Sequence, residues 1–150
     1  LYSIEEALRA VGDALQPLPG AKVIVLVGHG FGRVSFGRGL AFERVEMENN
    51  YQETRRALQA ARTSVFCLDV TEADYHSLEA GLQLVAADTG GFFERTHLFT
   101  RQAMDRLAGA LAGHYVLFVE TADVKPGIRR IEVELTRRSG RVFAKKTFEG

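Results

Sequence analysis

Lys22-Val23-Ile24-Val25-Leu26-Val27 is a lysine followed by an unbroken run of aliphatic residues, and it ends at Gly28. Such a run, rich in β-branched residues, is typical of a strand that is buried on both faces of a parallel sheet. A second run of the same kind, Ser64-Val65-Phe66-Cys67-Leu68-Asp69-Val70, follows further along the chain. We therefore expect two neighbouring strands of one covered sheet.

Helical patterns alternate with these strands. Ser3 and Glu6 make a capping-box pattern, and apolar residues then recur at helical spacing until Pro17. Apolar spacing, cap residues and glycine breaks predict further helices at residues 50–62, from residues 71–73 to about 88, and at about 100–112. A third strand is expected at residues 92–95, and a loop with a short hairpin before residue 48. Strands that alternate with helices in this order are parallel and joined by right-handed crossovers.

The C-terminal part has a different pattern. Apolar and charged residues alternate in Ile131-Glu132-Val133-Glu134-Leu135, which is typical of an antiparallel strand with one face in water. We expect strands at residues 115–120, 130–136 and 141–148, forming an antiparallel β extension (113–150) packed on an α/β domain (1–112). The predicted fold class is α/β: a three-layer α/β/α, Rossmann-like parallel sheet with a C-terminal antiparallel β extension.

Composition excludes several classes of function. The 19 basic and 19 acidic residues balance, so no net positive field favours nucleic acid. A single cysteine excludes an internal disulfide and a multi-cysteine zinc site. No apolar run approaches the roughly 18 residues of a membrane-spanning helix. We expect a globular domain that neither binds nucleic acid nor spans a membrane.

The order of these segments resembles that of a known family. Leu18-Pro19-Gly20-Ala21-Lys22 before the first apolar strand, and Ala60-Ala61-Arg62-Thr63-Ser64 entering the second, are similar to successive segments of von Willebrand factor A domains. Leu82-Gln83-Leu84-Val85 before the Gly90-Gly91 turn is similar to a later one. His114-Tyr115-Val116-Leu117-Phe118 resembles the tail of von Willebrand factor A-related proteins common in acidobacterial genomes. The resemblance implies a von Willebrand factor A-like domain whose N-terminal strands would precede Leu1.

The resemblance also implies where a metal site would lie. Metal-binding members hold Mg²⁺ through an Asp-x-Ser-x-Ser motif, a later Thr and an Asp-Gly turn after the fourth strand, all of which offer oxygen ligands. This chain has no Asp-x-Ser-x-Ser, and Gly28-His29-Gly30 stands in place of the Asp-Gly turn. An imidazole suits zinc or copper better than Mg²⁺. We therefore expect a degenerate or incomplete site, with no metal and no cofactor.

These features together predict a non-catalytic protein–protein interaction or adhesion module. Family resemblance implies an extracellular or periplasmic location. The strand at residues 22–27 would have an open edge, and such edges aggregate or recruit a partner strand. The expected occupant is a protein partner, a segment preceding Leu1, another chain or a homodimer contact. A metal-dependent adhesin with its metal residues upstream of Leu1 is an alternative.

The expected ligand-binding face lies at the carboxyl ends of the parallel strands, where ligands of open α/β sheets gather. Asp69 is expected to cap the turn after its strand rather than to bind a ligand. The loop residues that would form the face are His29, Gly30, Phe31, Arg33, Asp69, Thr71 and Glu72, with residues 94–96 after the third strand as a further candidate segment.

An α/β-hydrolase-like enzyme is the other alternative. Gly28-His29-Gly30 is similar to the oxyanion loop of these enzymes, but no serine lies in the Gly-x-Ser-x-Gly frame that the chemistry needs. A dinucleotide fingerprint would need a third glycine where Arg33 stands. Cys67 lies within an apolar strand, where a thiol is usually inert. The four histidines show no helical pairing and no cysteine partners, so a preformed zinc site is not expected.

Overall fold

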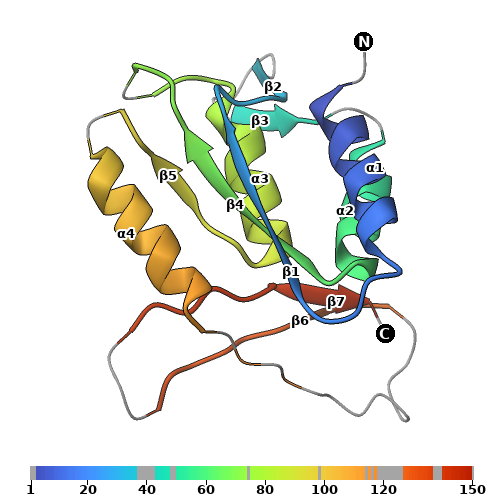
Figure 1. Ribbon diagram of the computed structural model, residues 1–150. Coiled ribbons are helices and arrows are strands. Elements are labelled where there is room, and N and C mark those ends of the chain that lie inside the picture. The colour runs from blue at the N-terminus through green and yellow to red at the C-terminus, as the bar shows by residue number, and fades with distance from the viewer. Residues whose placement is uncertain are drawn as a thin grey trace.

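Parallel pairing of the two apolar runs forms the centre of the structure, a computed structural model (Figure 1). β1 (Lys22–Gly28) pairs with β4 (Thr63–Asp69), so that Lys22 lies opposite Thr63 and Gly28 opposite Asp69. β5 (Phe93–Arg95) pairs in parallel with the other side of β4, which gives the strand order β1-β4-β5. The predicted parallel α/β sheet is confirmed.

The structure describes residues 3–36, 43–47, 50–73, 75–97, 99–113, 115, 117, 127–136 and 140–149. The helices in these ranges alternate with the strands of the parallel sheet, and none of them is long and apolar enough to cross a membrane. They are α1 (Ile4–Leu15), α2 (Tyr51–Ala60), α3 (Glu79–Thr89) and α4 (Thr100–Leu111).

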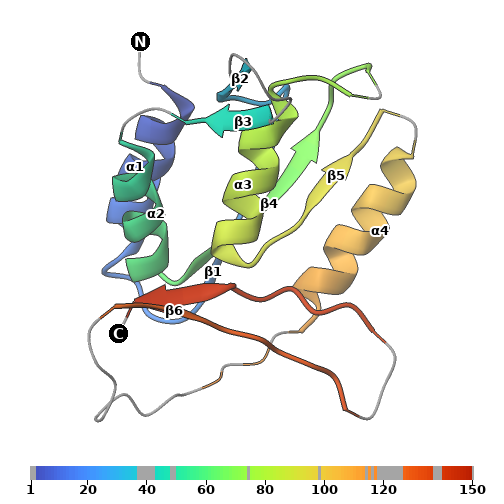
Figure 2. The same cartoon turned by 180° about the vertical axis from the view of Figure 1, so that it is seen from behind.

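The helices cover opposite faces of β4. On one face Val65 and Cys67 belong to a buried cluster with Leu82 of α3 and with residues of α1 and α2. On the other face Phe66 and Leu68 pack in a second cluster beneath α4. Seen from behind, α3 runs along the back of the sheet, with α1 and α2 to one side and α4 to the other (Figure 2). β4 is therefore enclosed on both faces.

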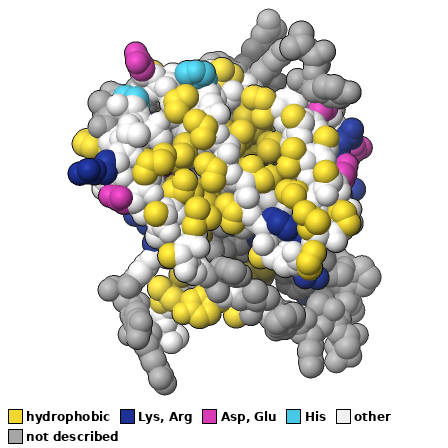
Figure 3. Space-filling view, in the orientation of Figure 1, with side chains coloured by type: hydrophobic (Ala, Val, Ile, Leu, Met, Phe, Trp, Pro, Cys, Tyr) yellow, Lys and Arg dark blue, Asp and Glu magenta, His cyan; other side chains and the backbone are white. Residues whose placement is uncertain are grey.

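β1 is covered on one face only. Ile24 and Leu26 pack against the α3-side cluster. Val23, Val25 and Val27 point to the other face, where they are 45%, 40% and 57% exposed. Hydrophobic side chains gather across the middle of this face in the space-filling view (Figure 3). Among the described residues, the parallel sheet thus ends at β1, and the apolar surface of this strand is uncovered on one face.

The capping box predicted for α1 is confirmed, and Asn50 is the N-cap residue of α2 in position only. The Ser3 hydroxyl accepts from the N–H of Glu6, and the Glu6 carboxylate accepts from the N–H of Ser3, at 3.1 and 3.2 Å. Asn50 precedes α2 but makes no capping hydrogen bond with its side chain. Tyr51 holds the start of α2 instead, because its hydroxyl donates to Asp88 at 2.8 Å.

The start of α3 differs from the prediction. The sequence predicts a helix from residues 71–73, whereas α3 begins at Glu79. The Asp69 carboxylate accepts a hydrogen bond from the N–H of Thr71 and pairs with His76, and these contacts hold the intervening segment as a loop. A short polar side chain that bonds nearby backbone competes with helix formation in this way.

Two antiparallel pairs lie outside the parallel sheet. β2 (Arg33–Phe36) and β3 (Glu43–Glu46) form the short hairpin expected before α2. β6 (Ile128–Arg130) pairs with β7 (Thr147–Glu149) near the C-terminus.

The three-stranded C-terminal extension is not found in the part of the chain that the structure describes. Residues 131–136 and 140–146 are not strands there, and the strand predicted at 115–120 lies largely outside the described residues. Phe143 packs against Phe92 beneath α4, with ring centroids 5.2 Å apart. This contact draws the segment onto the α/β domain instead of into a longer strand.

Gly81 lies where α3 crosses the loop after β1. A Cβ there would stand 2.2 Å from the carbonyl oxygen of Phe31, so Gly81→Ala is expected to lower the free energy of unfolding by about 1–3 kcal/mol. Apart from the neighbouring backbone of its own helix, a Cβ added at Gly109 of α4 would meet no other atom within 4 Å. Gly109→Ala is therefore expected to raise the free energy of unfolding by about 0.5–1 kcal/mol. Urea unfolding followed by circular dichroism measures both. Equal effects would contradict the close contact of α3 with the loop.

Candidate functional site

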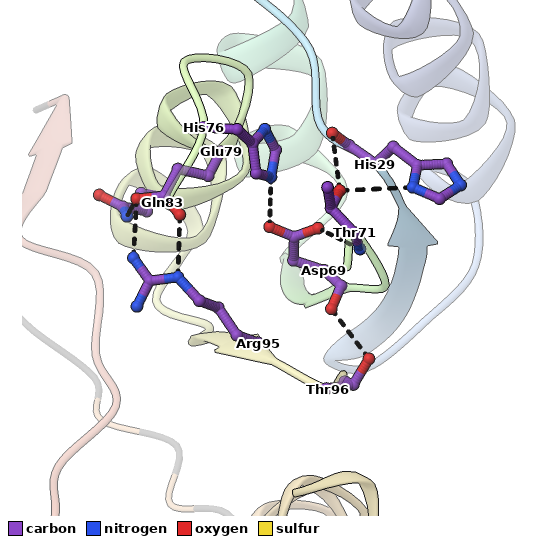
Figure 4. Close-up of polar contacts among 8 residues, drawn as sticks. All are labelled: His29, Asp69, Thr71, His76, Glu79, Gln83, Arg95 and Thr96. Carbon is purple, nitrogen blue, oxygen red and sulfur yellow. Dashed lines mark hydrogen bonds and ion pairs between the residues drawn. The ribbon is translucent and has the colours of Figure 1, made fainter. Parts of the chain in front are cut away.

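Polar side chains gather where the carboxyl ends of the three parallel strands meet (Figure 4). His29 follows β1, Asp69 ends β4 and Arg95 ends β5. His76 comes from the loop before α3, and Glu79 is the first residue of that helix. Ligands of open parallel sheets bind at this edge, so it is the candidate functional site.

Asp69 is the most deeply buried of these side chains, with 1% of the residue exposed. Its Oδ1 accepts from the N–H of Thr71 at 2.9 Å, and its Oδ2 lies 2.7 Å from Nε2 of His76. Burial raises the pKa of Asp69, but the hydrogen bonds from Thr71 and His76 outweigh burial and hold the pKa below its ordinary 3.8. Asp69 is therefore an anion at neutral pH, and its predicted role in capping the turn is confirmed.

Glu79 is paired with Arg95. Nε and Nη2 of Arg95 donate to the two carboxylate oxygens at 2.9 and 2.8 Å, which makes the pair bidentate. The guanidinium also lies over the ring of Tyr75, 4.4 Å from its centroid. These hydrogen bonds to Glu79 raise the pKa of Arg95. Arg95 is thus a fixed positive charge on one side of the site.

His29 and Thr71 join the loops that follow β1 and β4. Nδ1 of His29 lies 3.3 Å from the Thr71 hydroxyl, and that hydroxyl lies 3.5 Å from the His29 carbonyl oxygen. Gly30 has a φ of +95°, and a Cβ there would stand 2.4 Å from the carbonyl oxygen of Leu78. Only glycine fits this close approach, which sets the position of the loop.

The structure brings together three residues of the predicted ligand-binding face: His29, Asp69 and Thr71. The assignment of Phe31 to that face is wrong, because its side chain is buried in the core on the α3 side. Its N–H donates to the carbonyl oxygen of Leu78 at 2.9 Å, which fixes the loop with the ring turned inward.

Glu72 is exposed on the loop after β4, and the side chain of Arg33 lies outside the described part of the structure. Sequence reasoning missed His76 and Glu79, and it reached Arg95 only as part of the segment 94–96 at the end of the third strand. A signal for His76 and Glu79 was present in the sequence. They stand three residues apart, a spacing that places side chains on one side of a helical turn, and they follow soon after a strand that ends in Asp. The pairing of Arg95 with Glu79 carried no such signal, since it joins two separate segments.

Three of these residues form a cluster with the composition of a metal site. Asp69, His76 and Glu79 each offer one ligand atom, and these atoms lie within 4.8 Å of one another. Imidazole nitrogen and carboxylate oxygen together suit transition metals. The predicted absence of a metal therefore stays a prediction.

The site offers little to nucleophilic catalysis. An Asp–His pair can orient a base, but among the described residues no hydroxyl or thiol is hydrogen-bonded to His76. Cys67 lies on the same strand as Asp69, yet it is fully buried and belongs to the cluster on the α3 side. Burial raises the pKa of Cys67 to about 12, so the reactive thiolate is scarce at neutral pH.

Asp69→Asn is expected to lower the free energy of unfolding by about 2 kcal/mol at pH 7, because it weakens hydrogen bonds to a buried anion. The folded-state pKa lies below the ordinary value, so this stabilisation is complete above about pH 5 and is lost as pH falls through the folded-state pKa. Urea unfolding in chelator-containing buffer should show a difference between wild type and variant at pH 7 that narrows as the pH falls below the ordinary pKa of an aspartate. Asp13→Asn, at an exposed position of α1, is the control and should change little.

Cys67 is the single cysteine of the chain, so thiol labelling reports on it alone. We expect no reaction of the folded protein with Ellman's reagent at pH 8, and one equivalent after unfolding in urea, because burial both shields the sulfur and keeps it protonated. Rapid labelling of the folded protein would instead indicate an accessible thiolate and would favour the enzyme alternative.

No protein-family model, curated protein or solved structure matches the chain. The resemblance to von Willebrand factor A domains therefore stays a prediction drawn from the residues. What the chain does is inferred from its own geometry.

Proposed function

We propose that the chain is a non-catalytic protein-interaction module that pairs with another polypeptide strand along the free edge of β1. In this proposal the parallel sheet belongs to a von Willebrand factor A-like, three-layer domain with an antiparallel C-terminal extension, in an extracellular or periplasmic protein. The observation that carries the interaction is the asymmetry of β1, which pairs with β4 on one side and with no described strand on the other, and whose valines are exposed on one face.

The backbone of β1 divides its hydrogen-bonding groups between two sides. The N–H of Lys22 donates to Arg62 at 3.0 Å, and the carbonyl oxygen of Gly28 accepts from Val70 at 3.1 Å. In a parallel ladder, alternate residues bond to the same neighbour. The even-numbered residues of β1 therefore bond to β4, while Val23, Val25 and Val27 direct their N–H and C=O groups to the free edge.

The same three valines present the uncovered face. Their side chains remain 40–57% exposed, whereas Phe66 and Leu68 of β4, on that face, are buried beneath α4. Backbone pairing groups and an apolar surface thus coincide at one place. Strand addition uses both, since main-chain hydrogen bonds supply affinity and side chains supply selectivity.

For residues 1–150 taken alone, the occupant that we assign to this edge is β1 of a second copy, and the N-terminal strands that the family resemblance implies would take the same place in a longer chain. β1 has no proline, and no charged residue follows Lys22 within the strand, so it lacks the features that protect edge strands from pairing. Antiparallel pairing about a two-fold axis at Val25 would place Val25 opposite its copy and Val23 opposite Val27. The outward-facing groups of both strands then match, and a single contact closes both open edges.

The catalytic alternative has weaker support. His29 contacts the Thr71 hydroxyl, and Asp69 accepts a hydrogen bond from the backbone of the loop before α3. These polar groups at the strand ends therefore already have hydrogen-bond partners within the chain. Gly30, next to His29, accommodates the close approach of the Leu78 backbone, which gives this glycine a structural explanation.

Sedimentation velocity over a wide range of concentrations tests the proposal. The wild-type chain is expected to form dimers. Val25→Pro is expected to be monomeric and folded, because it removes an outward N–H and leaves the bonds to β4 intact. Leu26→Pro, one residue away, should instead unfold the sheet, because it removes a bond to β4.

Val11→Lys provides the control for exposed apolar residues, since Val11 is 43% exposed on α1, away from β1. It should leave the dimer unchanged. A wild-type chain that stays monomeric at every concentration, or a folded Val25→Pro variant that still dimerises, would show that β1 is not the contact.

A further inference from the structure

We infer that Asp69, His76 and Glu79 form a binding site for a zinc-type divalent cation, independently of the contact proposed for β1. The site lies at the carboxyl end of β4, where a buried carboxylate, an imidazole and a second carboxylate converge (Figure 4).

The ligand atoms lie near enough to one another for small side-chain movements to bring them around one cation. Zinc binds nitrogen and oxygen ligands at about 2.0–2.2 Å in tetrahedral geometry, which separates the ligand atoms by about 3.3–3.6 Å. Oδ2 of Asp69 and Nε2 of His76 are 2.7 Å apart, and all three ligand atoms lie within 4.8 Å of one another. Cation binding would break the hydrogen bond from Nε2 of His76 to Asp69 and displace its proton, and side-chain movements of roughly 1 Å would then bring the three atoms to ligand distance.

The surroundings hold the ligands in place. The N–H of Thr71 fixes Oδ1 of Asp69, which leaves Oδ2 directed at His76. The side chains of His76 and Glu79 are only 17% and 12% exposed. A hydrogen bond to the second oxygen of a ligating carboxylate is the kind of support that orients metal ligands. The N-terminus of α3 disfavours a cation, and the two carboxylates offset this effect.

The ligand types select among cations. Mg²⁺ and Ca²⁺ take oxygen ligands almost alone, whereas an imidazole with two carboxylates suits Zn²⁺ and its neighbours among the transition metals. Three protein ligands leave the fourth position of a tetrahedral zinc ion to water.

Arg95 competes with the cation for Glu79. It donates to both oxygens of Glu79, so a cation must displace at least one of these hydrogen bonds. Tyr75 beneath the guanidinium gives Arg95 a second contact that it can keep when Glu79 turns to the metal. Removal of Arg95 should therefore tighten binding.

Isothermal titration calorimetry of the full chain with Zn²⁺ tests the inference. The wild type is expected to bind one equivalent and to give little heat with Mg²⁺. His76→Ala and Glu79→Gln are each expected to weaken binding roughly tenfold or more. Arg95→Met is expected to bind severalfold more tightly. Co²⁺ provides an optical readout, since the visible absorption of a bound, low-coordinate ion should disappear in His76→Ala.

Glu94 and Arg106 supply matched controls, because they form a second carboxylate–guanidinium pair outside the cluster. Glu94→Gln and Arg106→Met should bind Zn²⁺ like the wild type. Circular dichroism and thermal melts establish that each variant is folded. If His76→Ala proves unstable, Glu79→Gln still tests the site, because its amide oxygen can accept a hydrogen bond from Arg95. Absence of zinc binding, or binding that folded Glu79→Gln and His76→Ala retain at wild-type strength, would overturn the inference. Arg95→Met binding no tighter than Arg106→Met would also count against it.

Discussion

β4 carries apolar side chains on both faces, so both faces must be buried. The positions of the helices and of the neighbouring strands follow from this requirement. Its residues alternate between two apolar clusters, with Val65 and Cys67 turned to α3 and Phe66 and Leu68 turned to α4. A strand buried in this way cannot end a sheet without leaving backbone groups unpaired, so β1 and β5 flank it in parallel. Parallel neighbours in turn need helical crossovers, which supply the covering layers.

The polar site follows from the same strand. Asp69 is the last residue of β4 and remains buried, and a buried carboxylate needs hydrogen-bond partners. Thr71 and His76 provide these partners. Because the two hydrogen bonds hold the residues between them as a loop, α3 begins only at Glu79. The loop that results brings an imidazole and a second carboxylate to the strand end. One buried charge therefore accounts for both the loop and the ligand set.

The two surfaces inferred here differ in kind and lie on different parts of the sheet. The edge of β1 is apolar, uncharged after Lys22 and rich in outward backbone groups, which suits a polypeptide strand. The strand ends carry charges that pair among themselves, which suits a small ion that can replace one of the partners. Substitutions in one surface should not disturb the other, because Val25 and Glu79 share neither a face nor a hydrogen bond.

The sequence by itself determined the parallel sheet, the order of helices and strands, and the cap of α1, because unbroken apolar runs, helical spacing and the Ser3–Glu6 pair are local signals. It also indicated that Asp69 caps a turn. Only the tertiary structure decided that α3 starts at Glu79, that Phe31 turns into the core, and that Arg95 pairs with Glu79. The reason is physical: these outcomes depend on contacts between segments far apart in the chain, where packing and buried charge override local propensity.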